Sequence, residues 1–170
     1  MKTIFFCIGL LFLIIGVSQA QSISPDKFIT KMLKDDSAMG LTLPGWIIKK
    51  GAKITISDEM DKRESDIIKE LTGSIKKLRI VVSEKLPSNY SKELVKLKNY
   101  FIEKSYETLI EVRDGSSDIS LWGQYDNNLI KNLVITVIDP NAESVFINIK
   151  SKINVDKLKS MNFYRELESL

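Results

Sequence analysis

Residues 129–153 read LIKNLVITVI, then DPNA, then ESVFINIK and SKI. The segment from Leu133 to Ile138 is apolar at every position except Thr136, and β-branched residues dominate it. Such residues suit a pleated strand, and a continuous apolar run predicts a strand that is covered on both faces. Asp-Pro-Asn then supplies a turn. The stretch therefore predicts a β-hairpin in the middle of a sheet.

The return strand of this hairpin alternates in polarity. Val145, Ile147 and Ile149 lie on one side, and the other side includes Ser144, Asn148 and Lys150. Side chains point alternately to the two faces of a strand, so this pattern predicts one face toward the core and one face in water.

Helical patterns precede this hairpin and strands surround it. Ser24-Pro25 is a favourable helix start, and helices are expected over 25–35, 58–75 and 90–104. Strands are expected over 78–82, 108–113 and 118–124, and Asp114-Gly115 predicts a tight hairpin between the last two. Asn154 can cap a final helix. The order predicts an α+β two-layer sandwich, with about five to six strands in a largely antiparallel or mixed sheet and helices packed on one face.

The stretch Leu41–Ser57 allows two interpretations. Leu41 to Leu43 can form a short strand that ends at Pro44-Gly45 and is followed by a helix from Trp46. Alternatively, the alternation over 52–57 indicates a strand. The first interpretation is preferred because proline suits the first turn of a helix and is excluded from a central strand.

The first twenty residues have the pattern of a secretory signal peptide. Lys2 provides the positive charge, residues 4–17 are apolar, and Ser18-Gln19-Ala20 resembles a cleavage site. We expect cleavage near Ala20/Gln21 and export to the periplasm or the medium. The expected domains are thus a signal peptide over 1–20 and a single α+β domain over 21–170, with a short frayed C-terminal tail. Cys7 lies inside the apolar run, where lipid attachment is not expected.

Composition excludes several classes of chemistry. Loss of the leader removes Lys2 and the only cysteine, leaving 24 basic and 22 acidic residues. This balance does not favour nucleic acid or an anionic membrane as a partner, and we do not expect an integral membrane protein after cleavage. The chain has no histidine, which removes imidazole ligands and Ser-His or Cys-His catalysis. We therefore expect no cofactor, no metal site and no enzymatic activity.

Several segments resemble one family. These are the leader, Leu43-Pro44-Gly45-Trp46, residues 75–81 entering a strand, residues 109–115, and the hairpin before Val155-Asp156-Lys157-Leu158. Together they resemble domain of unknown function family 4252. The resemblance implies a small exported protein of Gram-negative bacteria, in a family that includes many assigned lipoproteins. Family genes often lie near extracytoplasmic-function sigma factors, which implies a role in envelope signalling. The chain departs from the pattern because it lacks a lipidation cysteine and has Ser151 where a glycine is expected.

Acidic clusters are weak candidates for a site. The run Asp58-Glu59-Met60-Asp61 suits the first turn of a helix, where the helix dipole favours anions. The residues Asp114 to Asp118 suit a tight turn better than a calcium site. Glu111 and Asp118 flank the same hairpin and are the candidate pair for a carboxylate hydrolase, although a solvated strand residue and a turn residue are the simpler interpretation.

Aromatic residues are the better candidates for a binding site. If Ile119 and Leu121 face the core, Trp122 points to the opposite, wet side, with Tyr125 following it. Tryptophan and tyrosine are enriched at binding hot spots. The alternative is that Trp122 is buried beneath the first helix or the Trp46-Ile47-Ile48 segment, since large apolar groups usually are. The candidate binding residues are Trp122, Tyr125 and Trp46.

The preferred function is a non-enzymatic periplasmic interaction or sensing module that binds an unknown protein partner in the cell envelope. One alternative is a carrier of a small apolar ligand or lipid in a space between helices and sheet. The third hypothesis is a carboxylate-based hydrolase.

Overall fold

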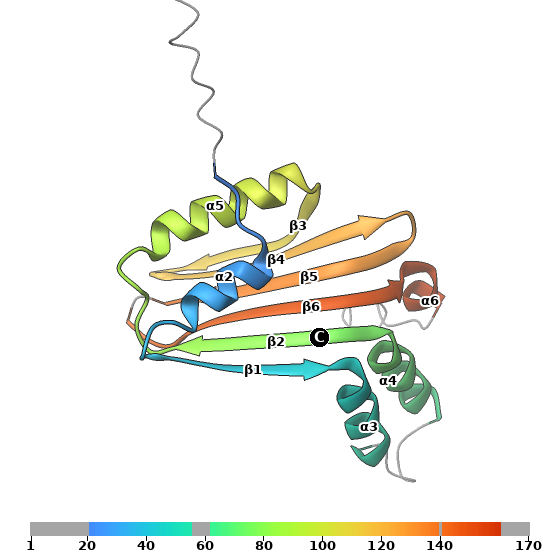
Figure 1. The fold of residues 1–170 in the computed structure, drawn as a ribbon. Helices are drawn as coiled ribbons and strands as arrows, with labels where there is room; N and C mark the ends of the chain where they lie inside the picture. The colour runs from blue at the N-terminus through green and yellow to red at the C-terminus, as the bar shows by residue number, and fades with distance from the viewer. Residues whose placement is uncertain (1–20, 56–61, 140, 161–170) are drawn as a thin grey trace, which may run out of the picture.

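A computed structural model describes residues 21–55, 62–139 and 141–160 of the chain. The expected leader, the whole acidic run from Asp58 to Asp61 and the expected C-terminal tail lie outside these residues. Within them the fold is α+β, as predicted, and consists of a six-stranded antiparallel sheet with helices (Figure 1).

The elements follow the order that the sequence predicts. The strands are β1 (Ala38–Pro44), β2 (Ile75–Ser83), β3 (Tyr106–Asp114), β4 (Ser117–Asp126), β5 (Leu129–Ile138) and β6 (Ser144–Asn154). The helices are α2 (Pro25–Met32), α3 (Gly45–Thr55), α4 (Lys62–Ser74), α5 (Tyr90–Glu103) and α6 (Val155–Ser160).

The β5–β6 hairpin forms the middle of the sheet. The strand order is β1-β2-β6-β5-β4-β3, so this hairpin has two strands on either side. All neighbouring strands are antiparallel. Gly115 lies in the β3–β4 turn with φ of +58°, a conformation that glycine adopts without strain. The prediction of a central hairpin is therefore confirmed.

Two helices cover one face of the sheet. In Figure 1, α2 and α5 lie in front of it, and their apolar residues meet side chains from the strands. The ring of Phe28 in α2 packs against that of Phe146 in a tilted arrangement with centroids 4.7 Å apart, and Phe101 of α5 packs against Trp122 in the same way at 4.9 Å. We call this side of the sheet the helix-covered face. Its aromatic contacts form the centre of the core.

The other helices lie at one end of the strands. Helices α3 and α4 pack against each other and contact β1, β2 and β6, and α6 follows directly from β6 (Figure 1). We call this the helix end of the sheet and the opposite one, with the β3–β4 and β5–β6 turns, the hairpin end. The preferred interpretation of 41–57 is confirmed in its order, because Pro44 ends edge strand β1 and α3 begins at Gly45.

Caps predicted from the sequence are present at two helices. The Ser24 hydroxyl accepts a hydrogen bond from the Lys27 amide at 3.4 Å, with Pro25 at the first helical position. The Asn154 side chain accepts from the amides of Asp156 and Lys157 at 2.9 and 3.1 Å. These bonds satisfy amide donors that have no partner within the first helical turn.

Candidate binding surfaces

The face of the sheet opposite α2 and α5 is apolar. Antiparallel partners point to the same side, so the strand register defines three rows of side chains across the sheet. The middle row is Leu41, Ile80, Ile147, Ile135, Leu121 and Ile110. The row toward the hairpin end is Met39, Val82, Val145, Val137, Ile119 and Val112. The row toward the helix end is Leu43, Leu78, Ile149, Leu133, Gly123 and Glu107.

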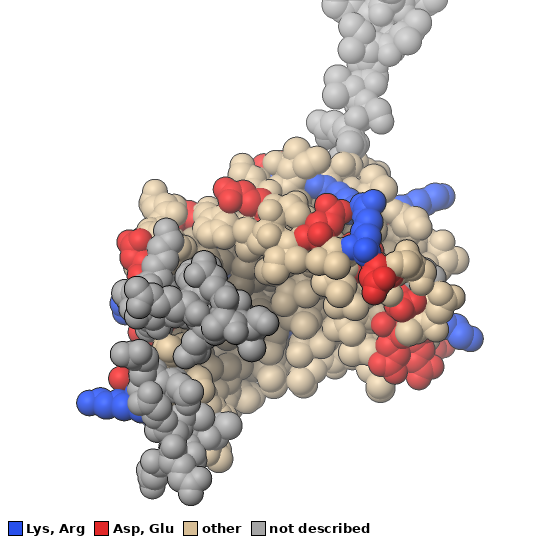
Figure 2. All heavy atoms as spheres, turned by 180° about the vertical axis from the view of Figure 1, so that it is seen from behind, with Lys and Arg blue, Asp and Glu red and all other residues tan. Residues whose placement is uncertain are grey.

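The covering helices α2 and α5 lie on the opposite side of the sheet from these three rows, which we call the open face; the residues of its middle row between the two edge strands are half-buried. Leu41 and Ile110, at the two edges of the middle row, are 51% and 50% exposed. Figure 2 views the sheet from this side, and the surface it shows there is predominantly tan, with a cluster of red side chains at the lower right and blue ones above and beside it. Within the rows, Glu107 on edge strand β3 is the one charged residue. The open face is thus a nearly uncharged aliphatic surface.

The sequence-based assignment of faces was wrong for the return strand. Ser144 and Asn148 were expected in water, yet they are 3% and 2% exposed on the helix-covered face. Val145, Ile147 and Ile149 lie on the open face instead. Phe146 explains the reversal, because it shares a side with Ser144 and Asn148 and packs against Phe28 of α2. An aromatic ring contributes a large buried area and so determines which side the helices cover.

Several polar groups on the helix-covered face bond to Asp26 of α2, whereas Arg79 Nε, Asn148 Oδ1 and Thr136 Oγ1 are buried without a hydrogen-bond partner in the described part of the chain. The Asn148 amide donates to Asp26 of α2 at 3.3 Å, and the Arg79 guanidinium donates to the same carboxylate at 3.2 Å. Lys77 and Lys150 also pair with Asp26. Burial opposes ionisation of Asp26, but the bonds from Lys150 and Arg79 outweigh it and lower the pKa of this carboxyl. Asp26 therefore attaches α2 to the sheet.

A second ion pair joins α2 to α5, between an exposed lysine and a buried glutamate. Glu93 of α5 accepts hydrogen bonds from Lys31 of α2 at 2.7 Å and from Lys96 at 3.0 Å. These bonds lower the pKa of Glu93. Polar contacts as well as apolar ones thus fix the two helices over one face.

Trp122 belongs to the core. It is 8% exposed and lies on the helix-covered face, so Ile119 and Leu121 occupy the open face rather than the core. Of the two alternatives for Trp122, the structure has the buried one. The covering element is α5, through Phe101, and not the first helix or the Trp46 segment.

The other two aromatic candidates lie elsewhere. Trp46 is 61% exposed on α3, with the Lys50 ammonium 5.2 Å from the centre of its ring. A Cβ built on Gly123 would meet the Tyr125 ring at 3.2 Å and Leu109 at 2.9 Å, so both side chains lie on the open side of the sheet. The structure therefore does not bring Trp122, Tyr125 and Trp46 together.

A pocket of about 230 Å³ lies between α5 and strands β3 and β4. Its walls are Phe101, Tyr106 and Trp122, together with Ile102, Thr108, Lys98 and Glu111. Burial raises the pKa of the Tyr106 phenol, which stays protonated. The pocket therefore has aromatic walls with a few polar groups. The sequence allowed a ligand space between helices and sheet and pointed to Trp122, but it did not indicate the other lining residues, because α5 and β3 meet only in three dimensions.

The acidic candidates are engaged in ion pairs. Arg113 donates to Glu111 at 2.9 Å and lies 3.9 Å from the nearer oxygen of Asp118. Glu111 lines the pocket beside α5, whereas Asp118 does not. Asp66 and Glu70 line a groove between α3 and α4, where they pair with Lys69 and Lys157. Among the described residues, no three acidic side chains lie close enough together to hold a metal ion.

The sequence profile of a family described as a domain of unknown function (DUF4252) matches residues 32–161. The chain belongs to the DUF4252 family. The match spans every strand and all the helices except most of α2, and it confirms the resemblance noted in the sequence. No curated protein and no solved structure matches the chain. No helix in the described part of this DUF4252 protein has the length and apolar character needed to cross a membrane.

Proposed function

We propose that this DUF4252 protein is an exported, non-enzymatic interaction module that binds a protein partner through its open face. One observation supports the proposal above all others. Residues 133–138 are apolar on both sides of the strand, but described helices cover only one side. A strand of this kind is typical of a sheet with two covered faces. We infer that a partner provides the second cover.

The size of the open face fits a protein surface. Six strands spaced about 4.8 Å apart, each with three side chains spaced about 6.6 Å apart, give a footprint of about 500 Å². Patches of a few hundred Å² on a monomer commonly mark interaction sites. A small molecule would leave most of such a flat area in water.

Charge at the margin favours a protein partner over a lipid surface. By their place in the strand order, exposed Asp36, Glu84, Asp114 and Glu143 lie at the hairpin end, where they outnumber the exposed basic residues Lys34, Lys85 and Arg113. An anionic bilayer would be repelled by these carboxylates. The expected partner is therefore a protein that presents an uncharged aliphatic patch of similar extent.

The leader motivates the proposed location. Residues 1–20 have the pattern of a cleavable signal peptide, so we place the interaction in the periplasm or outside the cell. A role in envelope signalling, as the family resemblance implies, is compatible with a module that binds and carries out no reaction.

Site-specific photo-cross-linking in cells tests this function. A photoreactive residue at Leu41 or Ile110 samples the two edges of the open face, and Val95, which is 58% exposed on α5, is the matched control. We expect positions 41 and 110 to capture the same identified protein and position 95 to capture none. Binding between the purified pair should then be lost in Ile110→Lys and kept in Val95→Lys. Equal labelling at all three positions, or none, would refute the proposal.

The aromatic pocket supports a second candidate function, the carrier of a small ligand. An apolar cavity of about 150 Å³ holds benzene, so 230 Å³ admits one ring with a small substituent but not a lipid chain. The pocket wall has two charged residues, of which Glu111 is paired with Arg113, whereas Lys98 takes part in none of the ion pairs among the described residues. These features favour a monocyclic aromatic anion.

Fluorescence tests the carrier function, since the chain has two tryptophans. Trp46→Phe leaves Trp122, in the pocket wall, as the single reporter. Benzoate should then change the tryptophan emission saturably and bind more tightly than benzylamine. Lys98→Gln should remove this difference in affinity, and the control Lys92→Gln should keep it. A linear response to both compounds would exclude the carrier function.

A further inference from the structure

We infer that the partner on the open face is a second copy of this chain, packed face to face with its strands running in the opposite direction. The inference rests on the proposed function, because it names the partner of the same surface. Three features of the described residues carry it: the uncharged rows, the opposite charge of the two ends of the sheet, and the size of the face.

The open face is complementary to an identical open face on a second copy. A two-fold interface uses the same patch on both subunits, so the patch must be complementary to itself. Charged patches usually fail this condition because like charges meet. Here the rows contain Leu, Ile, Val and Met, apart from Gly123 and the edge residue Glu107. Two flat aliphatic sheets can pack about 10 Å apart, as in a β-sandwich.

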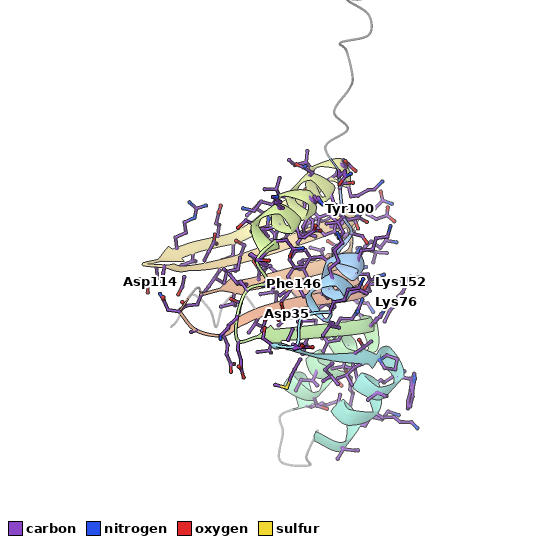
Figure 3. The ribbon with its side chains drawn as sticks, turned by 60° about the vertical axis from the view of Figure 1, so that its left-hand side comes forward. Asp35, Lys76, Tyr100, Asp114, Phe146 and Lys152 are labelled. Carbon is purple, nitrogen blue, oxygen red and sulfur yellow. The ribbon has the colours of Figure 1, made fainter. Side chains whose placement is uncertain are left out.

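Charges at the two ends of the sheet select the direction of packing. At the hairpin end, the described acidic residues outnumber the basic ones and include Asp35, Asp36, Glu84, Asp114, Asp139 and Glu143. At the helix end, basic residues prevail and include Lys49, Lys50, Lys53, Lys69, Lys76 and Lys152. Figure 3 shows Asp114 at one end of the sheet and Lys76 and Lys152 at the other.

Two arrangements bring the open faces together by a two-fold axis in the plane of the interface. With the axis along the strands, each acidic end would meet the acidic end of the other copy. With the axis across the strands, each acidic end meets a basic end. Unlike charges steer association and stabilise the encounter, and like charges oppose it. The second arrangement is therefore the expected one.

The buried area reaches the range of a specific dimer. A footprint of about 500 Å² on each copy gives a total of about 1,000 Å², which is the lower bound for a biological interface. Because side chains project from the sheet, the accessible area that they bury is larger than this flat footprint. The interface would also be more apolar than most. We expect a dimer that dissociates on dilution, because the area is small.

The chosen axis makes a geometric prediction. An axis across the strands runs along the middle row, so each residue of that row lies opposite its own equivalent. Leu41 should face the Leu41 of the second copy, and Ile110 should face Ile110. With the axis along the strands, Leu41 would instead face Ile110 across the interface.

Single-cysteine variants distinguish these arrangements, because the only cysteine of the chain, Cys7, lies in the expected leader. Leu41→Cys, Ile110→Cys and the control Val95→Cys are each secreted with their own leader and treated with a short bismaleimide. We expect the Leu41→Cys and Ile110→Cys variants each to form covalent dimers alone, and Val95→Cys to stay monomeric. Light scattering of the unmodified protein over a range of concentrations should show the dimer, and Ile110→Glu should abolish it while Val95→Glu does not.

Other outcomes overturn the inference in distinct ways. Cross-linking only in a mixture of the Leu41→Cys and Ile110→Cys variants would refute the strand direction. A monomer at all concentrations, together with one different protein captured in cells at both positions 41 and 110, would refute the second copy and leave the proposed function intact. A monomer whose cysteines at 41 and 110 do not react with maleimide would show that the chain covers its own open face, which refutes both.

Discussion

Phe28 should contribute more to stability than any surface residue of the two covering helices. It is 1% exposed, and its ring lies 4.7 Å from that of Phe146 and 5.9 Å from that of Tyr90. Replacing a buried phenylalanine by alanine commonly costs about 3–5 kcal/mol. Two aromatic contacts at about 1 kcal/mol each are part of this loss. Because a domain of this size has about 5–15 kcal/mol in total, Phe28→Ala should remove a large fraction of its stability.

Urea denaturation followed by circular dichroism measures this loss. Phe28→Leu keeps most of the apolar volume but loses the ring contacts, so we expect about 1–2 kcal/mol for it. Val95→Ala, on the exposed side of α5, should stay within about 0.5 kcal/mol of the unmodified protein. A cost for Phe28→Ala below about 1 kcal/mol would refute the packing of α2 described above.

Three further predictions concern the attachment of α2, the start of α3 and the end of the sheet. The pKa of Asp26 is lowered in the folded protein. The ionised Asp26 therefore contributes its full share to the free energy of unfolding above about pH 5, and this share is lost as the pH falls through the folded pKa. Asp26→Asn should accordingly flatten the pH dependence of the urea midpoint between about pH 3 and pH 6. Gly45→Ala should lower the melting temperature, because its Cβ would lie 2.2 Å from the Ile75 carbonyl oxygen. Ser151→Ala should cost about 1 kcal/mol in urea, because the buried Ser151 hydroxyl donates to the Ile130 carbonyl at 2.7 Å; no measurable change would show that this bond is dispensable.

The role of Ser151 explains one departure from the family pattern. A glycine was expected after the last strand, but β6 continues to Asn154 and Ser151 lies within it. The register between β5 and β6 shifts between Ile130 and Asn132. The Ser151 side chain bonds the backbone at that irregularity, a contact that glycine has no side chain to make.

The candidate site was predictable only in part. Alternation grouped Val145, Ile147 and Ile149 on one side of their strand, and Ile119 and Leu121 on one side of theirs, and the structure keeps both groups together. Alternation did not show that these aliphatic residues lie on the side without described helices. Small polar residues such as Ser144 and Asn148 were expected in water, yet both are buried. The Asp139 amide donates to the Ser144 hydroxyl and the Asn148 amide donates to Asp26, while Asn148 Oδ1 has no partner among the described residues. Partners distant in sequence decide whether burying a polar group is costly.

The same distinction applies to the aromatic residues. The sequence identified Trp122 as a notable side chain and left two environments open for it. The choice depended on Phe101, which lies 21 positions earlier on helix α5. No local pattern contains that information.

By itself, the sequence determined the order of helices and strands, the central hairpin, the Asp-Gly turn and the caps at Ser24 and Asn154. These features depend on residues within one or two turns of each other, where propensity and hydrogen bonding act locally. The tertiary structure alone decided which face of the sheet the helices cover and where Trp122 lies. Both faces are rich in apolar groups, so hydropathy cannot rank them. The ring contacts of Phe28 and the bonds to Asp26 distinguish the two faces, and those partners meet only after folding.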